Sequence, residues 1–225
     1  MASRTAAVLI SVFLIGALCV PTHARDPKPN PWVEALPAKI DTKRRHLFYL
    51  HGHIIEKTQQ RRPRHPSYGV YDYDQVLAAL TADGALVISE VRPRGTQPTA
   101  YARKVAGQIQ RLLEAGVPAE RIGVVGFSRG GWIAQLISAQ LEHPIRYVML
   151  AFCPSPDQPR RPLHGAVLSI RERSDHTAGS CEPLFRASTA AKTRALTIDI
   201  GGRHGAFYRP HAAWTKPLLQ FLSAP

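Results

Sequence analysis

The sequence predicts a three-layer α/β/α domain built on a mostly parallel sheet of about six strands. Short and nearly continuous apolar runs alternate with longer segments in which apolar residues recur at helical spacing. Such runs are typical of parallel strands that are covered on both faces. Alternation of strands with helices requires crossover connections, which place helices on both faces of a parallel sheet. The length of 225 residues suits one such domain.

The predicted strands are short and rich in β-branched or other large apolar residues. In chain order they are His46–Leu50, Ala85–Ser89, Ile122–Val125, Tyr147–Ala151, Ala166–Ile170 and Ala195–Ile200. Parallel strands end at a common edge, and open α/β sheets bind their ligands beyond the carboxyl ends of the strands. We therefore expect functional residues in the loops that follow these segments.

Helical periodicity predicts the segments that connect the strands. These are Tyr73–Thr81, Tyr101–Glu114, Ser128–Leu141 and Lys216–Leu222. Gly116 should end the second helix, because glycine readily adopts the left-handed conformation that follows many helices. Pro144 ends the third.

The start of the chain has the composition of a secretory signal peptide. A positive residue is followed by an apolar run and by small residues at a cleavage site near Ala24. We expect a signal peptide over 1–24, an extended proline-containing lead-in over 25–45 and the folded domain over 46–225. The mature protein would be periplasmic or secreted, without stable membrane insertion. An uncleaved membrane anchor is the alternative.

Export would leave an even number of cysteines, because Cys19 belongs to the leader. The two that remain are Cys153 and Cys181. In an oxidising compartment such a pair is more often a disulfide than two free thiols. The bond would tie two adjacent loops at the expected functional edge.

The chain is strongly basic. Its net charge of +13 falls to +12 without Arg4, since residues 1–24 contain no other Lys, Arg, Asp or Glu. Such a charge suits a nucleic acid, an anionic surface or an acidic substrate. No nucleic-acid motif or repeated aromatic platform accompanies it. We expect an arginine-rich surface and no nucleic-acid partner, with anionic substrates or cell-envelope polymers as the alternative.

The segment Gly126-Phe127-Ser128-Arg129-Gly130 has the G-x-S-x-G pattern of a nucleophile elbow. The pattern also arises by chance, but here it lies between a predicted buried strand and an amphipathic helix. A serine on so sharp a turn has its hydroxyl lifted clear of the sheet. The flanking glycines are needed because a Cβ at either position would crowd the neighbouring strand and helix. We therefore predict that Ser128 is a nucleophile.

A serine nucleophile needs a base, and the base needs an acid that orients it, because an unassisted hydroxyl is protonated at neutral pH. His204 follows the last predicted strand in a glycine-rich loop and is the predicted base. Asp175 follows the fifth strand and is the predicted acid. Glu172 and Asp157 are the alternatives for the acid.

Two backbone amides are expected to stabilise the negative oxygen that forms during acyl transfer. One belongs to Arg129, directly after the nucleophile. The other belongs to His53, in the loop that follows the first predicted strand. Gly52 would let the backbone of that loop turn inward.

A metal site is the alternative interpretation of the same loop. His51 and His53 would lie on one side of an extended strand, and Glu56 or His65 would complete the ligands. No second ligand pair with convincing spacing follows, so we expect no metal.

These motifs resemble those of the α/β-hydrolase superfamily, in a small form without a lid domain. The resemblance covers roughly residues 46–222 and rests on Leu50-His51-Gly52, on the segment 126–131, and on Asp175 and His204. It implies the triad order nucleophile, acid, base and an acyl-enzyme intermediate, with no metal or organic cofactor. Most of the leading antiparallel hairpin of the usual sheet is expected to be missing.

The expected function is that of an exported serine hydrolase that cleaves a carboxylic ester on a small molecule or a polymer. An anionic substrate is compatible with the arginines expected near the same edge, which are Arg62, Arg64, Arg129, Arg171 and Arg173. The alternatives are a peptidase, thioesterase or acyltransferase with the same triad, and a non-catalytic envelope or binding protein on this scaffold. The sequence specifies neither the substrate nor the oligomeric state.

Overall fold

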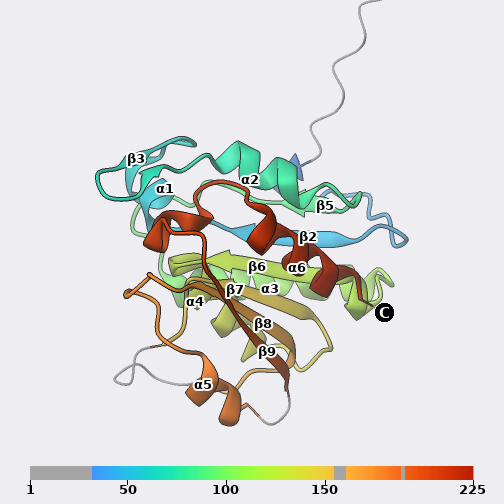
Figure 1. Ribbon diagram of the computed structural model, residues 1–225. Coiled ribbons are helices and arrows are strands. Elements are labelled where there is room, and N and C mark those ends of the chain that lie inside the picture. The colour runs from blue at the N-terminus through green and yellow to red at the C-terminus, as the bar shows by residue number, and fades with distance from the viewer. Residues whose placement is uncertain (1–31, 155–160, 189–190, 225) are drawn as a thin grey trace, which may run out of the picture.

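The computed structural model describes residues 32–154, 161–188 and 191–224 (Figure 1). The expected signal peptide and Asp157 lie outside these residues. The central sheet has seven strands in the order β1-β5-β2-β6-β7-β8-β9, and every neighbouring pair is parallel. The strands are β1 (Trp32–Val33), β2 (His46–Leu50), β5 (Leu86–Ile88), β6 (Ile122–Phe127), β7 (Arg146–Leu150), β8 (Gly165–Glu172) and β9 (Ala191–Ile198).

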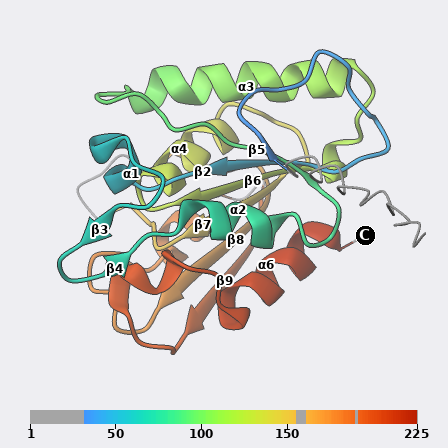
Figure 2. The same ribbon diagram turned by 90° about the horizontal axis from the view of Figure 1, so that it is seen from above.

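Helices cover both faces of the sheet, which gives the three layers that the sequence predicts. Figure 2 shows α3 (Pro98–Glu114) and α4 (Arg129–Ser138) on one face, and α2 (Tyr73–Leu80) and α6 (Ala212–Ser223) on the other. Shorter elements lie in the loops. They are α1 (His53–Thr58), the ribbon of β3 (Arg64–His65) with β4 (Gly69–Val70), the 3-10 helices η1 (Ala119–Arg121) and η2 (Arg203–Phe207), and α5 (Glu182–Arg186).

The core consists of two apolar layers, one on each face of the sheet. Successive side chains of a strand point to opposite faces, so each strand contributes to both layers. In β6, Val124 packs in the layer beneath α3 and α4, whereas Val125 packs in the layer beneath α2 and α6. Both valines are fully buried, which explains why the predicted strands have continuous apolar sequences.

The predicted helix boundaries are close to those observed, with some shifts. Gly116 has a φ of +87° just beyond α3, as expected for a glycine that ends a helix. The helix after Ser128 ends at Ser138, three residues before the predicted Leu141. The short helices α1 and α5 and the β3–β4 ribbon were not predicted.

The lead-in contains a short strand that the sequence analysis did not expect. In β1, Trp32 lies opposite Val87 of β5, and the two strands are parallel. Within the described residues, the central sheet therefore has no antiparallel strand at this edge.

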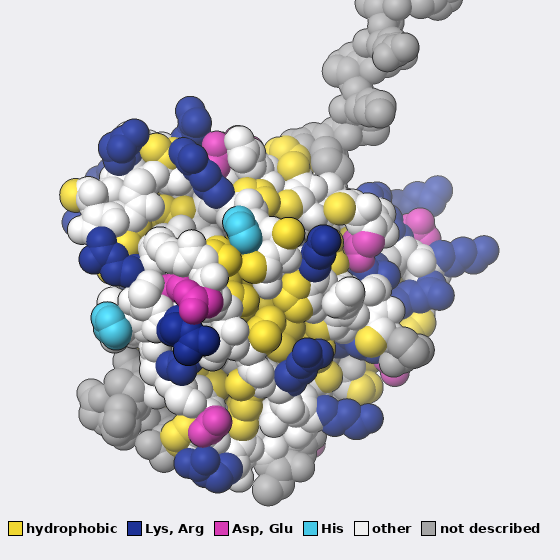
Figure 3. Space-filling model, in the orientation of Figure 1, with side chains coloured by type: hydrophobic (Ala, Val, Ile, Leu, Met, Phe, Trp, Pro, Cys, Tyr) yellow, Lys and Arg dark blue, Asp and Glu magenta, His cyan; other side chains and the backbone are white. Residues whose placement is uncertain are grey.

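Basic side chains are spread over the face of the molecule that Figure 3 shows. In Figure 3, Lys and Arg occur over much of the visible face, with Asp and Glu between them and no single basic patch. None of the helices in the described part of the chain has the length and hydrophobicity needed to span a bilayer.

Candidate active site

Ser128 lies on a strained turn between β6 and α4. Its backbone has φ 53° and ψ −116°, a conformation that residues with a side chain rarely adopt. Its amide donates a hydrogen bond to the carbonyl of Leu150 at the end of β7, 2.9 Å away. Its own carbonyl accepts the first bond of α4, from the amide of Trp132. The turn is thus fixed from both sides, which supports the predicted nucleophile elbow.

Close packing explains the glycines around this turn. A Cβ on Gly130 would overlap the carbonyl oxygen of Leu50 in β2, and a Cβ on Gly126 would overlap the carbonyl of Gly130. At Gly131 a Cβ would lie 2.5 Å from the Cβ of Phe152. The neighbouring strand and the start of the helix therefore leave no room for side chains, as the sequence analysis expected.

The structure brings together the three residues that the sequence analysis proposed as a triad. The Ser128 Oγ lies 2.9 Å from Nε2 of His204, and Nδ1 of the same ring lies 2.7 Å from Oδ2 of Asp175. Ser128 follows β6, Asp175 follows β8, and His204 lies in η2 beyond β9. All three loops leave the carboxyl edge of the sheet. This arrangement can transfer a proton from the serine to the imidazole.

Thr177, which was not predicted from the sequence, supports Asp175. The backbone amide and hydroxyl of Thr177 lie 2.9 and 2.6 Å from Oδ1 of Asp175, and the hydroxyl lies 2.8 Å from Nδ1 of His204. Burial acts to raise the pKa of Asp175, but hydrogen bonds from His204 and Thr177 outweigh it and lower the pKa. The carboxyl group is therefore ionised at neutral pH. A threonine two residues after the predicted acid was the available sequence signal.

Glu172, an alternative for the acid, forms hydrogen bonds with two loops instead of with His204. Its carboxylate accepts hydrogen bonds from the amide and hydroxyl of Ser174 and from the amide of Gly201. These bonds join the loop that carries Asp175 to the loop that carries His204. Burial acts to raise the pKa of Glu172, but the hydrogen bonds outweigh it and lower the pKa.

The two predicted oxyanion donors begin two different helices. His53 is the first residue of α1, and Arg129 is the first residue of α4. The amide of a first helical residue has no acceptor within its helix, which is compatible with the predicted role of both groups as oxyanion donors. Gly52 precedes His53 in an extended conformation with φ −70°. A Cβ there would lie 2.8 Å from the Phe127 ring, so close packing is the structural reason for this glycine.

A buried ion cluster, formed by Glu56, Arg92 and Arg129, joins the helices that carry these donors. Oε2 of Glu56 lies 3.3 Å from Nε of Arg92 and 3.4 Å from Nε of Arg129. Glu56 and Arg92 have 1% or less of their side chains exposed. The guanidinium of Arg129 also donates to the carbonyl of Thr96. Arg129 was expected near the substrate, but its side chain is directed into this cluster.

His51 is buried beside this cluster and forms hydrogen bonds with the backbone. Its Nε2 accepts a hydrogen bond from the amide of Arg92, and its Nδ1 donates to the carbonyl of Gly52. Burial, assisted by the charge of Arg92, holds the pKa of His51 well below its usual value, so the ring is neutral. The loop is not an extended strand, since a helix begins at His53. Within the described ranges, no three His, Cys, Asp or Glu side chains are placed to hold a metal ion.

A cavity of about 450 Å³ opens at Ser128 and His204. The β3–β4 ribbon forms part of its wall, where the rings of His65 and Tyr68 stack with centroids 4.3 Å apart. The Tyr68 ring lies 5.8 Å from the ring of His204. The other lining residues are His53, Ile54, Lys57, Thr58, Arg64, Pro66, Phe127 and Tyr208.

Four of the five arginines that the sequence analysis placed near the substrate do not line this cavity. Arg64 lines it. Arg62 lies 3.2 Å from Asp72, Arg171 lies 3.2 Å from Thr197, and Arg173 lies 2.8 Å from Asp199.

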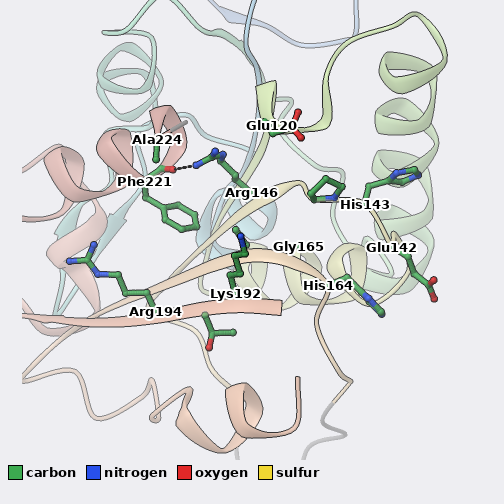
Figure 4. Close-up of a pocket in the computed structure, with 13 residues that line it drawn as sticks. Glu120, Glu142, His143, Arg146, His164, Gly165, Lys192, Arg194, Phe221 and Ala224 are labelled. Atoms are coloured by element: carbon green, nitrogen blue, oxygen red, sulfur yellow. Dashed lines mark hydrogen bonds between the residues drawn. The ribbon is translucent and has the colours of Figure 1, made fainter. Parts of the chain in front are cut away.

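A larger cavity of about 660 Å³ lies at the opposite, amino edge of the sheet (Figure 4). It is lined by the first residues of β7, β8 and β9, among them Arg146, Lys192 and Arg194. Arg146 donates a hydrogen bond to the carbonyl of Phe221. This cavity is remote from the elbow, because Ser128 follows the carboxyl end of β6.

The two cysteines of the described chain lie at disulfide distance, with Cα atoms 5.1 Å apart. Cys153 follows β7, and Cys181 immediately precedes α5. A bond between them would connect the loop after β7 to the segment that follows Asp175, as the sequence analysis expected.

Comparison with known proteins gives similarity in structure alone. No protein-family model matches the chain, and no curated protein matches it. A carboxylesterase from Mesorhizobium loti superposes with a TM-score of 0.54 at 19% identity, over 83% of this chain and 91% of that chain. A thioesterase from the prodiginine pathway of Streptomyces coelicolor has a TM-score of 0.52 at 14% identity, over 95% and 97%.

A third neighbour is a putative hydrolase of the α/β superfamily from Xanthomonas campestris. It has a TM-score of 0.53 at 15% identity, over 79% of this chain and 99% of that chain. The layers, the parallel sheet and the elbow agree with these similarities. The chain has the fold of the α/β-hydrolase superfamily.

Proposed function

We propose that this protein is an exported serine hydrolase that cleaves a carboxylic ester through an acyl-enzyme. The observation that carries the proposal is the contact of Ser128 Oγ with Nε2 of His204, at 2.9 Å, on a strained elbow. Asp175 completes the arrangement on the other side of the imidazole. Solved neighbours with this fold include a carboxylesterase and a thioesterase, which is consistent with acyl transfer.

In the first half of the reaction, Ser128 attacks the ester carbonyl while Nε2 of His204 accepts its proton. Asp175 accepts a hydrogen bond from Nδ1–H and stabilises the imidazolium that forms. The carbonyl oxygen becomes negative and is bound by the amides of His53 and Arg129. The tetrahedral intermediate then collapses, the alcohol leaves with the proton from His204, and Ser128 carries the acyl group.

In the second half, water replaces the alcohol. His204 accepts a proton from the water, whose oxygen attacks the acyl carbonyl. The same two amides bind the second oxyanion. Collapse of this intermediate releases the carboxylic acid and returns the proton to Ser128.

Hydrolysis of a panel of acyl substrates tests this function. We expect turnover of 4-nitrophenyl acetate and butyrate by the purified mature protein, and its loss in Ser128→Ala. Faster cleavage of acyl thioesters or of peptide amides would reassign the same triad to a thioesterase or a peptidase. Transfer of the acyl group to an added alcohol in preference to water would indicate an acyltransferase. A folded protein without any turnover would support a binding protein on this scaffold.

Export is a separate part of the proposal. The signal-peptide composition of residues 1–24 supports it, and so does the pairing distance of Cys153 and Cys181. We expect the mature protein in a periplasmic or extracellular fraction, with an N-terminus near residue 25 and no free thiol by mass spectrometry. A cytoplasmic, uncleaved chain with two reactive thiols in the folded domain would contradict export.

A further inference from the structure

Two basic side chains of the catalytic cavity have no hydrogen-bond or ion-pair partner among the residues that the structure describes. Lys57 lies on α1 and Arg64 lies on β3, and both line the cavity that contains Ser128 and His204. Neither side chain makes a hydrogen bond or an ion pair with the residues that the structure describes. Figures 1 and 2 both place α1 beside the β3–β4 ribbon at one end of the molecule.

Neighbouring arginines on the same segment of chain are neutralised. Arg61 forms ion pairs with Asp74 and Glu34, and Arg62 pairs with Asp72 at 3.2 Å. Unpaired cations also occur elsewhere on the surface, but within this segment the difference coincides with the cavity. Arg61 and Arg62, which do not line it, have carboxylate partners, whereas Arg64 at its wall has none among the described residues.

Among the described residues, no carboxylate lines the cavity to compensate for these charges. The nearby acids are already engaged: Glu56 with Arg92 and Arg129, and Asp175 with His204 and Thr177. The site therefore combines two cations with a wall that is otherwise mainly apolar and aromatic. Such a cleft concentrates anions and strengthens their attraction to fixed charges.

We propose that the substrate is an ester that carries an anionic group, a carboxylate, phosphate or sulfate, and that Lys57 and Arg64 bind this group. The inference rests on the proposed ester hydrolysis at Ser128. Both residues lie on the α1 and β3 side of the cavity, so the anion would bind there while the ester carbonyl lies between Ser128 and the amide of His53. A planar guanidinium can bind such an anion through two hydrogen bonds, and a lysine adds a point charge.

Two pairs of esters test whether the anion is preferred and on which side of the ester it lies. The acyl arm compares 4-nitrophenyl hydrogen adipate with 4-nitrophenyl methyl adipate. The alcohol arm compares 4-acetoxybenzoate with its methyl ester. Within each pair the compounds differ in one negative charge, so the ratio of their kcat/KM values measures the preference for the anion. We expect the kcat/KM ratio of anionic to neutral ester to exceed one in at least one arm. This ratio should decrease as the salt concentration increases, because salt screens exposed charges.

The variants Lys57→Gln and Arg64→Gln test which residues bind the anion. Exposed ion pairs contribute about 0.2–1 kcal/mol, so each substitution should lower the ratio roughly 1.4- to fivefold and the double variant about two- to 25-fold. The matched control is Lys192→Gln with Arg194→Gln, which removes the same two charges at the amino edge of the sheet. That control should leave the ratio unchanged.

The outcomes separate this inference from the function on which it depends. No turnover of any of the four esters by folded protein would overturn the proposed function and the inference together. Turnover with a ratio of one in both arms would overturn the inference and leave ester hydrolysis intact. An anionic preference that falls equally in the control and in the double variant would show a general effect of net charge, and would overturn the assignment to Lys57 and Arg64.

Discussion

The two edges of the sheet each have a cavity, but they differ in the backbone and in the side-chain contacts that surround it. Both edges have a cavity with basic side chains in its wall, and the one at the amino edge is larger, at about 660 against 450 Å³, and also contains Glu120 and Glu142. At the carboxyl edge the backbone is strained at Ser128, and Gly130 packs against Leu50 without room for a side chain. There, too, an imidazole joins a serine to a carboxylate. Close packing at a glycine occurs at both edges, since a Cβ on Gly165 in the amino-edge cavity would lie 2.3 Å from the carbonyl oxygen of Ile145. The strained backbone of a non-glycine residue, Ser128, and the paired side chains distinguish the candidate active site.

The largest expected effect is the loss of activity on removal of the nucleophile or base. We expect Ser128→Ala and His204→Ala to lower kcat by about 10⁴-fold or more, because each removes a step that the other residues cannot supply. The matched variant Arg194→Gln at the amino edge should retain full activity. Ester-hydrolysis kinetics measure kcat, and circular dichroism checks that each variant is folded. A Ser128→Ala enzyme that keeps a tenth of the activity would contradict the account.

Gly130→Ala tests the close packing at the elbow. Its Cβ would meet the backbone of Leu50, which cannot move without a shift of β2, so we expect a loss of about 3 kcal/mol or more in the free energy of unfolding. Gly107 in α3 is the control, because a Cβ there meets no atom within 4 Å. Gly107→Ala should stabilise the protein by about 0.5–1 kcal/mol. Urea denaturation measures both, and equal effects would refute the packing argument.

Glu56→Gln tests the buried ion cluster that joins α1 to α4. Removal of its charge leaves Arg92 and Arg129 uncompensated, so we expect a loss of about 3 kcal/mol in the free energy of unfolding. A small shift of the two oxyanion amides should also lower kcat by roughly 10- to 100-fold, with less change in KM for a neutral ester.

Glu34→Gln is the control for this cluster, since Glu34 pairs with Arg61 at the surface and is 71% exposed. It should change the free energy of unfolding by less than about 0.5 kcal/mol. If Glu56→Gln lost stability but kept kcat, the cluster would be structural without a role in positioning the amides.

The last effect is the dependence of stability on pH between about 5 and 6.5. Burial lowers the pKa of His46 and, more strongly, that of His51. The unfolded chain then binds more protons than the folded protein, so the free energy of unfolding should fall as pH decreases below about 6.5, by up to about 1.4 kcal/mol per pH unit for each histidine. The pKa values of Asp175 and Glu172 are lowered, so these two groups change the free energy of unfolding only at more acidic pH.

Urea denaturation from pH 7.5 to 5 measures this dependence, and His51→Asn should reduce its slope. An unchanged free energy of unfolding across this range would show that the two rings are protonated without cost in the folded protein.

Much of the fold could be predicted because its strands are fully buried and its longer helices are amphipathic. Ser128 and His204 could be placed because each follows a strand that is visible in the sequence, and parallel strands end at one edge. The helix α1 was missed because six residues are too few for a clear helical period.

The interactions that support the site depend on tertiary contacts. Glu56 and Arg92 are 36 positions apart, and no local pattern predicts that their side chains meet in the core. The side chain of Arg129 was expected near the substrate because Arg129 follows the nucleophile. In the structure its guanidinium lies beside the buried carboxylate of Glu56 instead. Lys57 was not singled out, because only the folded chain places it in the cavity of Ser128.

Labelling with a fluorophosphonate, followed by peptide mass spectrometry, tests the central claim most directly. A serine whose proton can pass to a neighbouring imidazole forms a covalent phosphonate adduct, whereas an ordinary surface serine does not react. We predict a single adduct on Ser128, formed slowly in His204→Ala and absent in Ser128→Ala. A folded protein that forms no adduct, or that forms it at another residue, would contradict the account.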